Sequence, residues 1–268
     1  MNQLADLISS ISDVVWNSIL LYLLVGTGII FTIRTRFVQV RKFGAGWKRL
    51  FGSFSLKGAK AGKEGMSSFQ ALTTAIAAQV GTGNITGCAT ALYSGGPGAI
   101  FWMWLSAFFG MSTIYGEAVL AQKYKTVGDD GHVTGGPIYY IKARFQGKFG
   151  RFLAGFFSLA IIFALGFTGN MVQANSISSA FKTAFGVNPR IVGVICAVIA
   201  AFIFLGGVRR IASFTEKIVP VMAIFYMVGC VVILCINHEM LIPAIKSIFV
   251  AAFDPRAILG GAVGITVR

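Results

Sequence analysis

The chain has 268 residues, of which 56% are hydrophobic and only 12% are charged, and its mean hydropathy is +0.76. This composition excludes an ordinary water-soluble domain, in which about a quarter of the residues are charged. The net charge of +14 would suit nucleic acid, but the Lys and Arg residues lie in loops between apolar stretches and not on one face of a domain. The sequence therefore predicts no nucleic-acid partner, and its basic loops are typical of a polytopic membrane protein.

Apolar stretches long enough to cross a bilayer, which takes about 20 helical residues, recur along the whole chain. The sequence predicts an all-α polytopic membrane protein with six spans, at residues 14–33, 66–93, 99–122, 152–185, 190–208 and 215–236. A shorter apolar piece follows at 241–252, and Asp254-Pro255 is a good start for one more helix. Because that helix has barely begun at Arg268, we expect the chain to be the N-terminal part of a longer protein.

The basic residues divide the loops into two groups. The loops after the first, third and fifth spans (34–63, 123–151 and 209–217) are rich in Lys and Arg, whereas those after the second, fourth and sixth hold few. Short cytoplasmic loops collect basic residues, so the first group is predicted to be cytoplasmic and the N-terminus outside. The predicted location is the plasma (inner) membrane, crossed several times, with the lipid bilayer as the surroundings of the spans.

The second span carries the clearest functional signal. Its centre, Gly81-Thr82-Gly83-Asn84, places two poor helix formers and an amide in the middle of an apolar helix. Unwinding over residues 80–84 would free carbonyls for a cation and place a half-helix N-terminus against an anion. The alternative is that the glycines only allow close helix packing, and this segment alone leaves both interpretations open. A phosphate-binding loop is disfavoured, because the Gly-Lys-Ser/Thr ending is missing.

A second polar group interrupts the fourth span. Phe163, Phe167 and Asn170 recur at helical spacing, so two rings and an amide could form one wall of a small pocket, with Gln173 one turn further on. Polar residues within a span are expected to face the bundle interior or a water-filled path. The alternative is hydrogen bonding between helices without a ligand, and for Asn170 and Gln173 both interpretations stay open.

Glu117 is an acidic residue well inside an apolar segment, and an ionisable group at such a position is a functional candidate. It lies near the cytoplasmic end of its span, a few residues before Lys123, which favours a structural or gating ion pair over a proton relay. The sequence has no Ser/His/Asp or Cys/His arrangement, and its four cysteines lack metal-ligand spacing. It therefore predicts neither an enzyme nor a bound cofactor.

Two strings of sequence carry a family resemblance. They are SSFQALTTAIAAQVGTGNITGCATALYSGGPGAIFWMWLSAFFGMSTIYGEAVLAQKY and, a few residues later, DGHVTGGPIYYI. Together they closely resemble the alanine or glycine:cation symporter family. The resemblance implies sodium-coupled symport of a small neutral amino acid, alanine or glycine, by alternating access. It also implies sodium as the coupling ion and a LeuT-like fold built from inverted repeats.

The resemblance also assigns residues to the two ligands. By likeness to the LeuT-type pattern, Ala77 and Val80 would offer backbone carbonyls to sodium. The substrate-binding residues implied are Gln79, Gly81, Thr82, Gly83 and Asn84 of the second span, and Phe167, Asn170 and Gln173 of the fourth.

In the same way, the resemblance divides the chain into three parts. Residues 1–65 would form a peripheral helix and a basic cytoplasmic loop, and residues 66–237 the first five-helix repeat, with its broken helix at 80–84. Residues 238–268 would form an extracellular half-helix and the beginning of the next span. The second repeat, including the helix that faces the break, would be missing. The alternative function is therefore a truncated, non-transporting fragment or one half of a split transporter.

Overall fold

The computed structural model describes residues 6–7, 10–12, 14–51, 68–128 and 133–254 of the chain. Several predictions fall on residues outside these ranges. They are the basic residues at 57–63, the first two residues of the predicted second span, and the helix predicted to start at Pro255.

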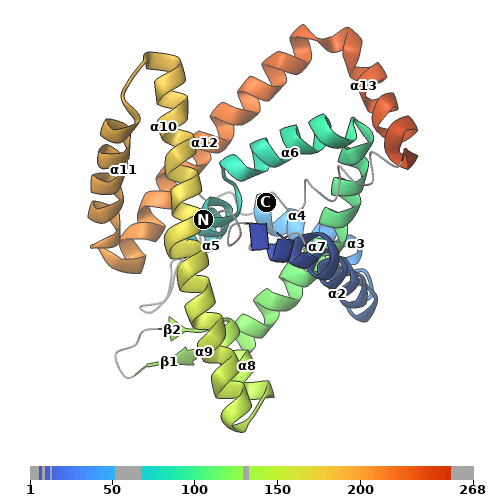
Figure 1. The fold of residues 1–268 in the computed structure, drawn as a ribbon. Helices are drawn as coiled ribbons and strands as arrows, with labels where there is room; N and C mark the ends of the chain where they lie inside the picture. The colour runs from blue at the N-terminus through green and yellow to red at the C-terminus, as the bar shows by residue number, and fades with distance from the viewer. Residues whose placement is uncertain (1–5, 8–9, 13, 52–67, 129–132, 255–268) are drawn as a thin grey trace. The chain divides into compact units, whose positions relative to one another are not determined.

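The described residues are almost entirely helical (Figure 1). The N-terminal elements are the π-helix η1 (Val15–Leu20) and the α-helices α2 (Leu21–Arg34), α3 (Val38–Arg41), α4 (Phe43–Phe51), α5 (Ser68–Gln79), α6 (Thr82–Gly95) and α7 (Gly98–Lys123). After them come β1 (Thr126–Val127), β2 (Val133–Thr134), α8 (Pro137–Arg144), α9 (Gly147–Phe163), the π-helix η2 (Ala164–Gly169), α10 (Asn170–Phe185), α11 (Pro189–Phe204), α12 (Gly207–Ile236), α13 (His238–Val250) and the 3-10 helix η3 (Ala251–Phe253).

Three helices among the described residues are long and apolar enough to cross a membrane: Gly98–Lys123, Gly147–Phe185 and Arg210–Ile236. Leu21–Arg34 and Pro189–Phe204 are apolar but shorter. The prediction of a helical chain with apolar spans is thus confirmed. The large apolar side chains on these helices are mostly exposed, because hydrocarbon and not water is the solvent for which they are suited.

The structure differs from the all-α prediction at one place. Strands β1 and β2 pair antiparallel in the loop after α7, with Thr126 opposite Thr134 and Val127 opposite Val133. The hydroxyl groups of the two threonines lie 3.0 Å apart, and the Tyr139 hydroxyl donates to Thr134 at 2.8 Å. β-branched residues favour extended backbone, which is the physical reason for this short hairpin.

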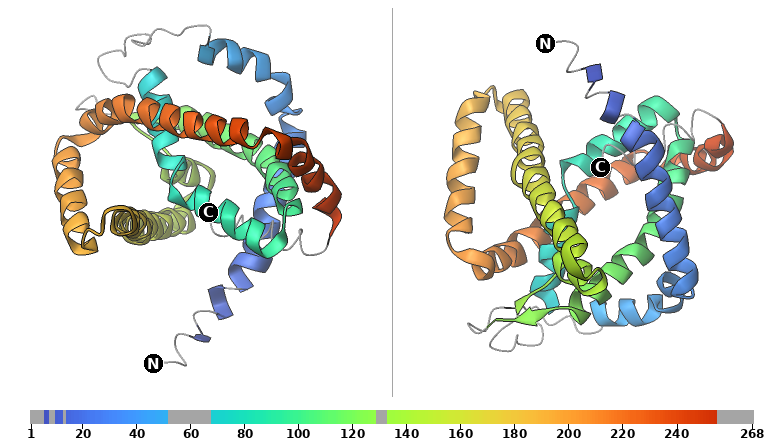
Figure 2. Two further views of the ribbon diagram at one scale, coloured as in Figure 1. Left: turned by 90° about the horizontal axis from the view of Figure 1, so that it is seen from above. Right: turned by 60° about the horizontal axis from the view of Figure 1, so that its bottom comes forward.

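The turn between α10 and α11 is specified by local sequence. Gly186 ends α10 in the left-handed conformation, with φ of 69°, which glycine adopts without strain. Asn188 then caps α11, because its side chain accepts a hydrogen bond from the Arg190 N–H at 3.0 Å, and Pro189 occupies the first position of the helix. These signals reverse the chain, so α10 and α11 lie side by side (Figures 1 and 2).

The chain divides into two compact units. The first comprises residues 1–53, 83–116 and 227–268, and the second comprises residues 54–82 and 117–226.

In the first unit, small and polar residues hold α2 against α7. The hydroxyl groups of Thr32 and Ser112 lie 2.7 Å apart, both buried, and Ser112 also donates to the Gly28 carbonyl at 3.0 Å. A Cβ added at Gly28 would lie 2.9 Å from the Phe109 Cβ and 3.0 Å from the Phe109 carbonyl oxygen, so the two backbones approach as closely as glycine allows. Close backbone approach and interhelical hydrogen bonds are what join helices in hydrocarbon.

The first unit also joins the start of α7 to the end of α13. The Trp102 indole N–H donates to the Ala252 carbonyl, and the Phe101 ring lies 5.9 Å from the Phe249 ring. A Cβ at Gly98 would collide with the Ala251 carbonyl oxygen. Backbone therefore packs on backbone at this point, with aromatic rings covering the contact.

We predict that Gly28→Leu lowers the stability of the folded protein by about 1–3 kcal/mol, the usual cost of overpacking. The leucine side chain would push α2 away from the Phe109 backbone and break the bonds of Ser112. Gly26→Leu is the matched control on the same helix, because nothing lies within 4 Å of a Cβ there. Reversible unfolding in detergent micelles measures both variants. Equal stability of the two variants would show that the close approach of α2 and α7 is not stabilising.

Candidate functional site

The candidate site is built on an interruption between α5 and α6. The last helical bond before it joins the Val80 N–H to the Ile76 carbonyl at 2.8 Å, α5 ends at Gln79, and α6 begins at Thr82. Val80 and Gly81 are therefore outside both helices, and the interruption is narrower than the predicted 80–84. Gly83 and Asn84 lie in the first turn of α6.

In the second unit, Gln173 of α10 lies directly against this interruption. Its side-chain oxygen accepts from the Thr82 hydroxyl at 2.8 Å and from the Thr82 N–H at 3.4 Å. Its side-chain nitrogen would lie 2.7 Å from a Cβ at Gly81, so a larger residue there would have to displace the end of the Gln173 side chain. An oxygen acceptor thus occupies the N-terminal end of α6, where helical N–H groups have no partner within the helix.

The carbonyl end of α5 has the opposite chemistry. Carbonyls at the last turn of a helix have no N–H donor ahead of them; Ala77 lies in the last turn of α5, and Val80 directly follows the helix. Backbone oxygens at a helix C-terminus suit a hard cation such as sodium. Among the described residues, no group of three or more His, Cys, Asp or Glu side chains is placed to hold a metal ion.

In the first unit, a hollow of about 210 Å³ lies between α6 and α7. Gly83 and Asn84 line it near the start of α6, and Met103 and Trp104 line it from α7. The other lining residues are Gly87, Cys88, Ile100 and Ala107. Its wall is mainly apolar, with the Asn84 amide and glycine backbone as polar groups, so it suits a small and partly apolar molecule.

The other predicted residues of the fourth span, Phe167 and Asn170, contact residues of their own span. A π-helix, η2, replaces regular helix over Ala164–Gly169, so the expected spacing is altered there. Phe167 stacks on Phe163 with ring centroids 5.7 Å apart, while the Asn170 side chain donates to the Gly166 carbonyl of its own helix at 3.2 Å. Of the predicted residues in this span, Gln173 is the one with a recorded contact to the interruption.

Sequence reasoning missed a polar contact between α5 and α12, both of which belong to the second unit over this stretch. The Gln70 amide donates to the Glu216 carboxylate at 2.9 Å, and the hydroxyl groups of Thr74 and Thr215 lie 3.2 Å apart. The predicted sixth span begins at Thr215 and so places Glu216 at a helix end. Since α12 begins at Gly207, Glu216 lies well inside a helix and is half-buried.

Glu117, the acidic candidate of the third span, is exposed and lies near Tyr140 of α8 in the second unit. Burial and the negative charge of Glu117 raise the pKa of the Tyr140 phenol above its ordinary value of 10.0. The interaction that the structure records for Glu117 is therefore with a phenol. The predicted ion pair of Glu117 is not among the contacts of the described residues.

A sequence model of the sodium:alanine symporter family matches residues 1–268. The chain is 44% identical to the sodium/alanine symporter AgcS of Methanococcus maripaludis over 98% of its own length and 57% of that protein.

Two relatives from Bacillus subtilis are similarly close. The putative sodium/proton-dependent alanine carrier protein YrbD is 41% identical, over 98% of this chain and 52% of that protein. The probable sodium/glutamine symporter GlnT is 38% identical, over 98% of this chain and 54% of that protein. The chain thus spans about half the length of these curated relatives, all of which are named as transporters and none as an enzyme. The match across the whole chain shows that this protein belongs to the sodium:alanine symporter family.

Proposed function

We propose that this chain supplies the first half of the transport core of a sodium-coupled symporter, which carries alanine or glycine across the plasma membrane by alternating access. The observation that carries the proposal is the interruption at Val80 and Gly81, braced by the Gln173 amide. Sodium binds at the carbonyls of Ala77 and Val80. The substrate carboxylate binds at the N-terminus of α6, where helix N–H groups attract an anion.

The proposed substrate site comprises residues on both sides of the interruption and residues of the fourth span. They are Gln79, Gly81, Thr82, Gly83, Asn84, Phe167, Asn170 and Gln173. A small substrate is supported by the hollow of about 210 Å³ beside Gly83 and Asn84, whose walls are mainly apolar. Relatives in this family are named for alanine and for glutamine, so substrate size must be decided by residues that vary within a shared framework.

The proposed arrangement is the LeuT-like inverted repeat. Residues 1–65 form the peripheral helix and basic loop, 66–237 the first repeat, and 238–268 the half-helix and the beginning of the next span. The N-terminus is outside, because the basic loops at 34–63, 123–151 and 209–217 are then all cytoplasmic.

Alternating access also requires a contact that opens on the cytoplasmic side. The bonds from Gln70 to Glu216 and between Thr74 and Thr215 join α5, the inner half of the interrupted helix, to α12. Both bonds can exchange with water when α5 swings away, so they hold the closed state without locking it. We propose this pair as the inner gate of the symporter.

The alternative function, a non-transporting fragment or one half of a split transporter, gains no support from the comparisons, because the relatives match 98% of this chain.

The transport proposal is tested by uptake of radiolabelled alanine into proteoliposomes under an inward sodium gradient. We expect saturable uptake that stops when potassium replaces sodium, and competition by excess glycine but not by glutamine. The 268-residue chain and the product of the intact gene are measured in parallel. Uptake by the chain alone would overturn the fragment alternative, whereas sodium-independent uptake by the intact product would overturn the proposal.

We predict that Gln173→Ala raises the KM for alanine about fivefold, since a lost hydrogen bond costs about 1 kcal/mol. Without the amide, the hydroxyl and N–H groups of Thr82 lose the acceptor that orients them. Asn175→Ala is the matched control, two residues further along the same helix and exposed. An unchanged KM in Gln173→Ala, or an equal change in the control, would remove Gln173 from the site.

We predict that Glu216→Ala speeds hydrogen exchange of the backbone amides in α5 about fivefold, because the bond that holds α5 to α12 is lost. Glu216→Gln keeps an acceptor oxygen and should show a smaller effect. Glu239→Ala, an exposed acid in the first turn of α13, is the control. Exchange in α5 that is the same in all three variants would exclude the proposed gate.

A further inference from the structure

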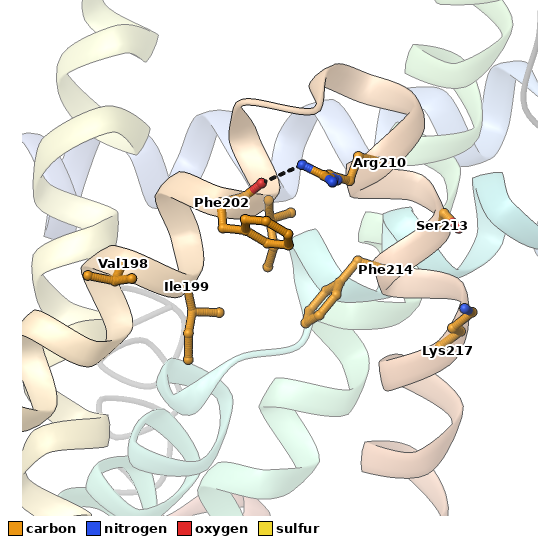
Figure 3. A pocket seen from close by; sticks show the side chains of 8 residues that line it. Val198, Ile199, Phe202, Arg210, Ser213, Phe214 and Lys217 are labelled. Atoms are coloured by element: carbon orange, nitrogen blue, oxygen red, sulfur yellow. Dashed lines mark hydrogen bonds between the residues drawn. The ribbon is translucent and has the colours of Figure 1, made fainter.

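A hollow of about 470 Å³ lies between α11 and the beginning of α12 in the second unit (Figure 3). Its wall is mainly apolar but contains two cationic side chains, Arg210 and Lys217. The remaining lining residues are Val198, Ile199, Phe202, Ile203, Ser213 and Phe214. We propose that this hollow binds an anionic phospholipid of the cytoplasmic leaflet, with the headgroup phosphate at the two cations and an acyl chain along the apolar wall.

The Arg210 guanidinium is held in place by the end of α11. It donates to the Phe202 carbonyl at 3.0 Å and lies over the Phe202 ring, 4.4 Å from its centroid (Figure 3). That carbonyl belongs to the last turn of α11, where the helix supplies no further N–H donor. A guanidinium carries five N–H donors in a rigid fork, so this bond orients the fork and leaves donors for a phosphate.

The charges around the hollow favour an anion. Arg210 and Lys217 are seven residues apart on α12, which places them on the same face of the helix. No acidic residue is among the eight that line the hollow. The neighbouring acid, Glu216, is turned to α5, where it accepts from Gln70. Two neighbouring cations beside an apolar wall favour an anionic ligand, and a phosphodiester supplies the charge.

The shape of the lining favours a lipid over a free anion. Phe202 from α11 and Phe214 from α12 point into the space between the two helices (Figure 3). Val198 and Ile199 extend the apolar wall along α11, away from the turn at Leu205 and Gly206. A free phosphate gains nothing from such a wall, whereas an acyl chain gains about 0.8 kcal/mol per buried CH₂.

The predicted position of the hollow, near the cytoplasmic surface of the membrane, also fits a lipid headgroup. The turn between α11 and α12 is one of the proposed cytoplasmic loops, and anionic lipids are recognised by basic pockets between helices on that side. This inference rests on the proposed orientation of the chain. It does not depend on the proposed transport activity, because lipid binding is measured without substrate or gradient.

The test compares two lipids with the same acyl chains, phosphatidylglycerol and phosphatidylcholine, added to the purified protein in a nonionic detergent. Native mass spectrometry counts the retained lipids. We expect phosphatidylglycerol to bind at least tenfold tighter than phosphatidylcholine. The double variant Arg210→Gln/Lys217→Gln should lose this preference. The control Lys182→Gln/Arg190→Gln should keep this preference. It removes the same charge near the turn between α10 and α11, at the end of α11 that is remote from the hollow.

Three results would overturn the proposal. One is equal retention of both lipids by the unchanged protein, and another is an unchanged preference in Arg210→Gln/Lys217→Gln. The third is displacement of phosphatidylglycerol by inorganic phosphate at an equal concentration, which would indicate a free anion as the occupant. If circular dichroism shows the double variant to be unfolded, the single variant Lys217→Gln decides, with a partial loss of preference expected and an unchanged preference contradicting the proposal.

Discussion

The structure depends on one constraint of the membrane interior, which is that every backbone N–H and carbonyl needs a partner when water is absent. An interruption of a helix leaves nearby backbone groups without helical partners; at Val80 and Gly81 the Val80 N–H still binds the Ile76 carbonyl, and other groups need polar partners from the surrounding chain. The Gln173 amide supplies an acceptor to Thr82. The carbonyl end of α5 also lacks N–H partners, and the sodium ion that we propose to bind there would satisfy those carbonyls.

The packing around this region uses polar and small residues for the same reason. Burial of apolar surface does not draw helices together in hydrocarbon, so close backbone contact and hydrogen bonds take its place. Gly28 and Ser112 join α2 to α7 in the first unit, and Glu216 and Thr215 join α12 to α5 in the second. The first kind of contact is buried, whereas the second is only partly buried, which suits the contact that we propose to open.

The charged residues Arg210, Glu216 and Lys217 of α12 face two different neighbours. Glu216 faces α5 and takes part in helix packing, while Arg210 and Lys217 face the hollow beside α11. Arg210 also closes the last turn of α11 by binding the Phe202 carbonyl. Glu216 and Lys217 are consecutive in the sequence but lie on different faces of α12. The contact that we propose to open during transport and the surface that we propose to bind lipid are therefore on different faces of one helix.

The sequence by itself determined the helical membrane class, because this class depends on composition and on the length of the apolar stretches. The family was evident from the resemblance of two long strings, and two glycines within an apolar run pointed to the interruption without excluding simple helix packing. Gln173 stood out as a polar residue within the fourth span, and the resemblance gave it a substrate-facing role. The tertiary structure decided which polar residues meet. Asn170 binds its own helix at the π-helical turn, Gln173 reaches Thr82, and Glu216 pairs with Gln70, 146 residues away. Such pairings depend on how helices that are far apart in the sequence pack together. A local sequence pattern contains no information about these contacts.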